Sequence, residues 1–313
     1  MRPGPPRGSA AWLLFALLAA SLTLLTACGG NSTGTPASPG GAPATPGGAP
    51  VTPAGTAPPK VHAWSGILIE RGTGEVLWSK APDKELPPAS CTKIMTALLV
   101  LEQATDLDAY ATVPDIPLPQ TVGVDLVPGD RITVREALTA LMVKSANDAA
   151  LTLASYVAGS EPAFTELMNA RAADLGLSHT HFVNCRGTPE PGHYSSARDL
   201  ATLGRFAMRD PVFRELVSAK TAVIRYPPDA AVPIESHNRL LDYPWGDGIK
   251  TGATGVSGKV LVGSGKPGPV ALIVVTMHEP TRDQEEKDAI ALFEWGTADY
   301  LRRSASIPAS GGP

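Results

Sequence analysis

The stretch PPASCTKIMTALLVLE, residues 87–102, directs the interpretation of the whole chain. From Ser90 onward, Ile94, Leu98 and Leu101 recur at a spacing that places them on one stripe of an α-helix. The stretch therefore predicts a helix that opens at Ser90 and packs one face against the core. Its N-terminus would put free backbone N–H groups and a partial positive charge beside the Ser90 side chain.

Ser90 and Lys93 form the first of three short polar motifs, S-x-x-K. Residues three apart share a helix face, so the Ser90 hydroxyl would lie beside the Lys93 amine. To accept the serine proton near neutral pH, the amine needs a pKa about three pH units below its usual value of ~10.4, and burial or a second cation would lower it. Taken alone, the pattern fits a surface capping serine and a solvated lysine better.

The second motif is Ser145-Ala146-Asn147, at a break between a predicted helix over residues 138–144 and another over residues 148–156. A hydroxyl at such a break can relay a proton to a leaving amine, and an asparagine amide can hold a peptide carbonyl. By itself this triplet carries almost no weight.

The third motif is Lys250-Thr251-Gly252, which Ala253 follows. On an edge strand, the lysine and threonine could bind a terminal carboxylate, and the glycine would leave room for a substrate backbone to lie alongside as an added strand. Considered alone, the triplet fits an exposed hairpin strand better.

Strands are predicted at both ends of the folded part. Residues 64–79 have the pattern of a β-hairpin, and residues 258–262 and 270–275 have the pattern of strands that would join the same sheet. The middle of the chain is helical in its periodicity, and a final helix is predicted over residues 282–302. Two helix starts are marked by capping pairs, Thr133 with Glu136 and Ser196 with Asp199.

This order of elements predicts an α/β (α+β) fold, in which an antiparallel sheet is flanked by helices and carries an inserted all-α lobe. The cleft between sheet and lobe would be the natural place for a ligand.

The N-terminus is typical of an exported lipoprotein. Two arginines precede an apolar run over residues 12–25, which is too short for a comfortable membrane span. The run ends in Leu25-Thr26-Ala27-Cys28, which resembles a bacterial lipobox. Residues 1–27 are therefore predicted to be a lipoprotein signal peptide, and Cys28 would carry the lipid that anchors the protein to the outer face of the cell membrane. The alternative is an ordinary secretory signal with an incidental cysteine.

The segment that follows is a predicted tether. No residue from Gly29 to Pro59 is charged, and a seven-residue unit occurs twice, as GGAPATP and GGAPVTP. Such a composition cannot offset the entropy of ordering. We therefore expect a disordered tether over 28–61, a folded domain over 62–303 and a disordered tail over 304–313, with no room for a further C-terminal β-domain or amphipathic anchor.

Composition excludes some classes of partner. The net charge is −4, with acids and bases mixed along the chain, so no basic stripe is present for nucleic acid. Apart from Cys28, only Cys91 and Cys185 are present, too few for a disulfide scaffold or a metal cluster. No metal or other cofactor is predicted.

The order S-x-x-K, S-x-N, K-T-G resembles that of penicillin-binding proteins and class A β-lactamases. The framework over residues 62–303 resembles the low-molecular-mass serine D-alanyl-D-alanine carboxypeptidases, peptidase family S11. The resembling stretches are PPASCTKIMTALLVLE, KSANDAALTLA, ELMNARAADLGLSHTHFVN, GHYSSARDLA, HNRLL and GDGIKTGAT.

The resemblance implies a reaction and a role for each motif residue. Ser90 would be acylated by a peptidoglycan stem peptide ending in D-Ala-D-Ala, Lys93 would be the base, and Ser145 would pass the proton to the departing D-alanine. The N–H groups of Ser90 and Ala253 would form the oxyanion hole. The substrate would be positioned by Asn147, Lys250, Thr251, Gly252 and Ala253, and β-lactams would act as covalent inhibitors.

The chain departs from the family pattern at three places. Cys185-Arg186-Gly187-Thr188 replaces the usual Pro-His-Gly-Leu, Cys91 replaces the usual leucine after Ser90, and the segment after Thr254 lacks the common Ala-Gly-x-Cys. These departures bear on substrate preference and rate. Because Cys91 and Cys185 both flank the expected site, a cross-link between them is one hypothesis, and two buried free thiols are the other.

Three other functions are weighed against this one. A β-lactamase would need a glutamate for deacylation, and Glu166 is the candidate, although it lies in a predicted amphipathic helix with Leu167 and Ala170 and is interpreted as structural or solvated. A metallopeptidase would need ligands such as His179, His181 and His193, but HExxH is absent. A non-catalytic lipoprotein on the same fold is the third alternative.

Overall fold

The computed structural model describes residues 57–117, 122–227 and 229–305. The predicted signal peptide, the lipidation site Cys28, most of the tether and residues 306–313 lie outside the described residues. Within the described ranges, no helix is both long enough and apolar enough to cross a membrane.

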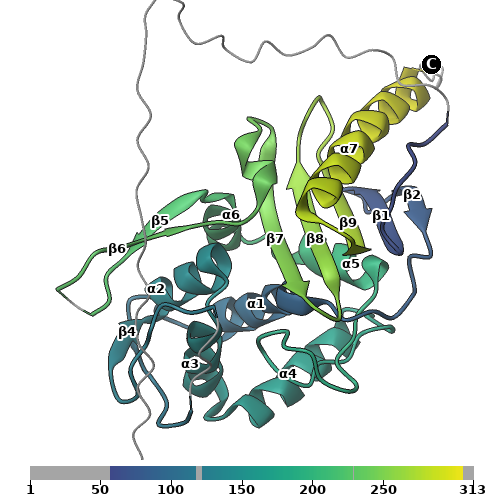
Figure 1. Cartoon of the computed structure of the whole chain (residues 1–313). Helices are drawn as coiled ribbons and strands as arrows, with labels where there is room; N and C mark the ends of the chain where they lie inside the picture. The colour runs from purple at the N-terminus through teal and green to yellow at the C-terminus, as the bar shows by residue number, and fades with distance from the viewer. Residues whose placement is uncertain (1–56, 118–121, 228, 306–313) are drawn as a thin grey trace, which may run out of the picture. The chain divides into compact units, whose positions relative to one another are not determined.

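A five-stranded antiparallel sheet forms the centre of the domain, in the order β2-β1-β9-β8-β7 (Figure 1). The strands are β1 (Ser65–Glu70), β2 (Val76–Lys80), β7 (Gly246–Thr254), β8 (Gly258–Gly265) and β9 (Leu272–Glu279). The predicted hairpin and the two predicted C-terminal strands are confirmed, and they share one sheet. β7, which carries the third motif, is an edge strand.

The two faces of the sheet bury different cores, because successive side chains of a strand point to opposite faces. In β1, Ile67 and Ile69 face the helical lobe, whereas Leu68 faces α7 (Arg282–Ala305). Figure 1 shows α7 lying across one face of the sheet, with the helical lobe on the other side. The predicted α/β fold with an inserted lobe is confirmed.

The helical lobe is inserted between β2 and β7. Its helices are α1 (Lys93–Gln103), α2 (Val134–Thr139), α3 (Asn147–Ala158), α4 (Glu161–Asp174), α5 (Ala197–Ala207) and α6 (Pro211–Ser218). It also contains two hairpins, β3 (Tyr110–Thr112) with β4 (Arg131–Thr133) and β5 (Thr221–Ile224) with β6 (Val232–Glu235). Three short turns complete it, η1 (Ala89–Thr92), η2 (Ala140–Lys144) and η3 (Arg239–Asp242).

The predicted helix after Ser90 is present, but it begins later and is more deeply buried than expected. Ser90 lies in the 3₁₀ turn η1, and α1 begins at Lys93 without a side-chain cap. Every residue from Lys93 to Val100 is buried. This part of the helix is therefore packed on all sides, since it is surrounded by α3, α4, α5, α6 and η2.

The two predicted capping pairs are present. The Thr133 hydroxyl accepts a hydrogen bond from the Glu136 N–H at 3.1 Å, and Ser196 accepts one from the Asp199 N–H at 3.1 Å. In a complete capping box, the Glu136 carboxylate would also accept from the Thr133 backbone N–H. Here it accepts instead from the Thr133 hydroxyl and from the backbone N–H of Arg225. Glu136 therefore ties the β5–β6 hairpin to α2.

The predicted apolar stripe of the helix around Glu166 is wrong. Leu167 and Ala170 are exposed on α4, and the buried face instead carries Phe164, Met168 and Ala172. Both stripes have helical spacing, so the sequence alone does not say which one meets the core.

Two glycines allow the chain to close tightly around η1. A Cβ on Gly252 in β7 would lie 2.8 Å from the Ala89 Cβ and 3.0 Å from the Ser90 nitrogen. Gly187 has a φ of +83°, and a Cβ there would lie 1.9 Å from the Ala89 carbonyl oxygen. No side chain fits either position without moving the turn that holds Ser90.

We expect Gly187→Ala to lower the free energy of unfolding by more than about 3 kcal/mol, because the methyl group would have to displace Ala89. Gly176→Ala is the matched control, since Gly176 has a φ of +71° and no neighbour within 4 Å of a built Cβ. In Gly176→Ala, only the strain of a non-glycine residue at positive φ should lower the free energy of unfolding, by about 1–2 kcal/mol. Urea denaturation measures both, and equal losses would contradict the packing argument.

Candidate active site

Ser90 and Lys93 meet at the junction of η1 and α1. The Lys93 Nζ lies 3.2 Å from the Ser90 Oγ. Ser90 is half-buried at the surface of a cavity, whereas Lys93 is fully buried. The Ser90 hydroxyl therefore lies between the cavity and the buried Lys93 amine.

Lys93 has two close acceptors besides the serine. Its Nζ donates to the Asn147 Oδ1 at 2.7 Å and to the Arg186 carbonyl oxygen at 2.7 Å. Burial lowers the pKa of Lys93 well below its ordinary value, and the nearby Lys250 cation lowers it further. Both effects favour the uncharged form of the amine.

A neutral amine has two hydrogens and one lone pair. The carbonyl oxygens of Asn147 and Arg186 take the two hydrogens, because neither can donate. In that form the lone pair would face the third neighbour, the Ser90 hydroxyl, whose oxygen lies 3.2 Å from the Lys93 Nζ. The geometry is that of a base ready to accept the serine proton.

Ser145 and Asn147 enter the site from a deformed helix end. α2 continues into the π-turn η2, and Ser145 ends it with a φ of +67°. Ser145 lines the same cavity as Ser90, while Asn147 begins α3. The left-handed Ser145 ends η2, and α3 begins two residues later.

The third motif reaches the site from β7. Thr251, Gly252 and Ala253 line the cavity, but Lys250 is buried, and its Nζ donates to the Thr251 carbonyl oxygen at 3.0 Å. Burial lowers the pKa of Lys250 to about 8, the neighbouring Cys91 thiol raises it, and Arg282 lowers it. The Lys250 amine thus lies beneath the part of the cavity wall that Thr251 forms.

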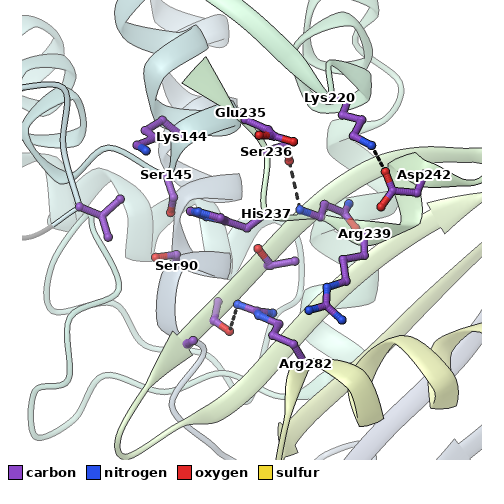
Figure 2. Close-up of a pocket in the computed structure, with 15 residues that line it drawn as sticks. Ser90, Lys144, Ser145, Lys220, Glu235, Ser236, His237, Arg239, Asp242 and Arg282 are labelled. Atoms are coloured by element: carbon purple, nitrogen blue, oxygen red, sulfur yellow. Dashed lines mark hydrogen bonds and ion pairs between the residues drawn. The ribbon is translucent and has the colours of Figure 1, made fainter. Parts of the chain in front are cut away.

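The cavity has a volume of about 650 Å³ and draws its walls from both the sheet and the helical lobe (Figure 2). Of the residues that the sequence predicts for the site, Ser90, Ser145, Thr251, Gly252 and Ala253 line the cavity, whereas Lys93, Asn147 and Lys250 do not. The other lining residues are Val122, Lys144, Lys220, Glu235, Ser236, His237, Asn238, Arg239, Asp242 and Arg282.

Two of these added residues lie near the motifs. Figure 2 shows the His237 ring directed toward Ser145 and Ser90, and Arg282 on the β7 side of the cavity. Burial lowers the pKa of His237, and the cations Lys250, Lys144 and Arg282 lower it further. Arg282 is the first residue of α7, where the helix dipole disfavours a cation, and this was the one signal that could have marked it from sequence.

The cross-link hypothesis for Cys91 and Cys185 is wrong, because both are buried free thiols. The Cys91 Sγ points to the Lys250 carbonyl oxygen at 3.5 Å, and the Cys185 Sγ lies 3.2 Å from the Glu161 carboxylate. Burial raises the pKa of Cys91 to about 12 and raises that of Cys185 well above the ordinary range. Neither thiol is set up to react.

The rival residues lie elsewhere or serve the fold. Glu166 is exposed on α4 and does not line the cavity. His193 is buried, with Nδ1 accepting from the Val183 N–H at 3.0 Å and Nε2 lying 2.9 Å from the Thr92 Oγ1. In the part of the chain that the structure describes, no three His, Cys, Asp or Glu side chains are grouped to hold a metal ion.

Comparison with known proteins gives consistent matches. The model of the D-alanyl-D-alanine carboxypeptidase family, peptidase S11, matches residues 52–281. D-alanyl-D-alanine carboxypeptidase DacF of Bacillus subtilis is 34% identical over 245 residues, which are 76% of this chain and 63% of DacF. DacB2 of Mycobacterium tuberculosis is 33% identical over 80% of this chain and 86% of its own length.

Solved structures agree in fold. The Streptomyces K15 DD-transpeptidase matches with a TM-score of 0.70 and 29% identity, over 78% of this chain and 100% of that one. Penicillin binding protein 6B of Escherichia coli matches with a TM-score of 0.71 and 34% identity, over 77% and 79%. The chain spans 63% of the length of DacF and 65% of that of DacD of Escherichia coli.

His193 should make stability depend on pH. Burial and, to a lesser extent, the nearby His181 lower its pKa from 6.5 to about 4, so between these values the unfolded chain binds more protons than the folded one. Stability is therefore full above pH 6.5 and falls as the pH drops toward 4, by roughly 2 kcal/mol at pH 5. We expect His193→Gln to remove this part of the difference between urea denaturation at pH 7 and at pH 5.

The control is His179→Gln, because His179 is not among the groups that shift the pKa of His193. It should keep the pH dependence of the wild type. An unchanged slope in His193→Gln would show that His193 is not the group that titrates.

Proposed function

The chain belongs to the D-alanyl-D-alanine carboxypeptidase family of serine peptidases, and on that premise we propose that it removes the terminal D-alanine from peptidoglycan stem peptides through an acyl-enzyme on Ser90. The observation that most supports the proposal is the position of the buried Lys93 amine, which lies 3.2 Å from the Ser90 hydroxyl and donates to Asn147 and to the Arg186 carbonyl at 2.7 Å each.

In the acylation step, Lys93 accepts the Ser90 proton as the Ser90 oxygen attacks the carbonyl carbon of the penultimate D-alanine. The N–H groups of Ser90 and Ala253 stabilise the negative oxygen of the tetrahedral intermediate, an effect worth about 3–4 kcal/mol per donor in other enzymes. The close approach of Gly252 to the Ser90 nitrogen is consistent with this pairing, because it brings the two backbone segments together.

The tetrahedral intermediate then collapses and the C–N bond breaks. The proton held by Lys93 passes through the Ser145 hydroxyl to the departing D-alanine nitrogen. Water next attacks the ester carbon, the acyl–oxygen bond to Ser90 breaks as Ser90 regains a proton that the water gives up, and the shortened peptide leaves with a new carboxyl group. Asn147 orients the Lys93 amine through its amide oxygen, in addition to the substrate contact that the family resemblance implies.

Substrate recognition would rest on the terminal carboxylate. Thr251 and Arg282 line the cavity, and the Lys250 charge lies directly behind Thr251. Together they favour an anion at this wall, since opposite charges at short range attract strongly where water is partly excluded. Gly252 and Ala253 would let the peptide backbone lie along the free edge of β7.

β-Lactams would be covalent inhibitors by the same attack. Intact-mass analysis after incubation with benzylpenicillin should show one adduct per chain, and Ser90→Ala should abolish both the adduct and D-alanine release from a diacetyl-lysyl-D-alanyl-D-alanine peptide. Ser178→Ala, on a loop outside the cavity, should behave as wild type. An adduct on Ser90→Ala would assign the nucleophile to another residue.

We further propose that the mature protein is exported and held at the outer face of the cell membrane by lipid on Cys28. The support is the sequence pattern alone, a charged start, a short apolar run and Leu-Thr-Ala-Cys at its end. Burying each CH₂ of an acyl chain contributes about 0.8 kcal/mol, so two or more chains hold a protein stably.

Expressed in a bacterium that processes lipoproteins, the wild type should enter the detergent phase on Triton X-114 partitioning, whereas Cys28→Ser should remain in the aqueous phase. Ser32→Ala, four residues further along the tether, serves as the control and should partition as wild type. Retention of Cys28→Ser in the detergent phase would rule out this anchor.

A further inference from the structure

Arg282 stands where a helix alone would not favour it. It is the first residue of α7, and the helix dipole repels a cation at that end. Its side chain is 23% exposed and lines the cavity. Some interaction other than helix formation therefore holds the guanidinium in place.

Glu285 supplies that interaction from one turn further along α7. Both of its carboxylate oxygens accept from the Arg282 Nη1, at 2.7 and 2.6 Å. The Glu285 side chain is 5% exposed, and a carboxylate this deeply buried is stable only when it is paired. Each charge therefore depends on the other, because removing one would leave the other without an ion-pair partner.

The same guanidinium reaches β7. The Arg282 Nη2 donates to the Gly252 carbonyl oxygen at 3.0 Å. The cis peptide bonds in the described chain are Tyr226–Pro227 and Gly248–Ile249, so the Gly252–Ala253 peptide is trans. In a planar trans peptide the C=O and the N–H point in opposite directions. Fixing the Gly252 oxygen therefore fixes the direction of the Ala253 N–H.

We propose that Glu285 is a positioning residue for acyl transfer: through Arg282 it holds the Gly252–Ala253 peptide so that the Ala253 N–H is aimed at the oxyanion. Glu285 touches no substrate and lies outside all three motifs. The inference rests on the proposed function, because it assumes that Ala253 supplies one of the two oxyanion donors.

The role predicts which kinetic constant changes. An oxyanion donor acts in the transition state, so misaiming it lowers kcat and leaves substrate affinity nearly unchanged. Removing such a donor outright typically costs 10²–10³-fold in kcat, and misaiming should cost about 10–100-fold. A pair that served only to bind the substrate carboxylate would instead raise KM, and only for substrates that carry one.

The test compares Glu285→Gln with Glu286→Gln, the same chemical change one residue on. Glu286 pairs with Arg239 and Tyr243 and has no contact with β7 among its hydrogen bonds. Each variant is assayed with two acyl donors, the diacetyl-lysyl-D-alanyl-D-alanine peptide and a diacetyl-lysyl-D-alanine methyl ester that lacks the carboxylate. Thermal denaturation of each variant establishes that it is folded at the assay temperature.

For Glu285→Gln we expect kcat to fall about 10–100-fold with both donors and KM to change less than about threefold, while Glu286→Gln matches the wild type. An effect on KM for the peptide alone, with the ester unaffected, would overturn the proposal. So would an equal loss in Glu286→Gln, because that would mark a general disturbance of α7.

If Glu285→Gln does not fold, Arg282→Lys carries the test. Lysine keeps a cation for Glu285, but its single ammonium cannot also hold the Gly252 oxygen in the forked geometry of arginine. The same loss of kcat with the ester is expected, and a wild-type kcat with the ester would overturn the proposal. Failure of the proposed function is distinguishable, because the wild type would then turn over neither donor.

Discussion

A lysine amine buried in the core is the constraint on which the rest of the site depends. A cation buried without an anionic partner would cost several kcal/mol, so burial favours the neutral form of Lys93, whose two hydrogens need acceptors. The acceptors are the Asn147 side chain and the Arg186 carbonyl, which come from chain segments far from α1. Holding them there requires the break at Ser145 and the tight passage of Gly187 past Ala89. The lone pair then has one neighbour left, and that neighbour is Ser90.

The sheet explains how residues 90 and 250 meet across the chain. β7 is an edge strand, so one side of its backbone pairs with β8 and the other is open for η1 and for a ligand. Gly252 removes the side chain that would keep η1 away, and α7, which packs on β8 and β9, starts with Arg282, whose guanidinium reaches the Gly252 carbonyl oxygen. The edge strand, the turn and the helix start thus converge on one peptide unit, which is why a residue outside the motifs can influence the chemistry.

The sequence predicted the parts of this arrangement that depend on local pattern. The hairpin, the C-terminal strands and the capping pairs follow from periodicity and from side chains that bond their own backbone, and all were found where expected. The family resemblance predicted that the residues of the three motifs belong to one site. The acceptor role of the Arg186 carbonyl had no signal, since every residue has a carbonyl. The direction of a thiol depends on packing, so the proximity of two cysteines to one site did not imply that Cys91 and Cys185 face each other.

The charges of the cavity connect binding to the base. Lys250 lowers the pKa of Lys93, and its own pKa is lowered to about 8 by burial, with Arg282 adding to the effect. These cations stand close together although the chain as a whole is negative, and the acids Asp283 and Glu286 are turned toward Arg239 on the rim. A carboxylate bound at Thr251 would supply the missing anion and weaken the field of Lys250 on Lys93. On the proposed function, the amine would then gain affinity for the serine proton once the substrate is in place, and recognition of the terminal carboxylate would be coupled electrostatically to activation of Ser90.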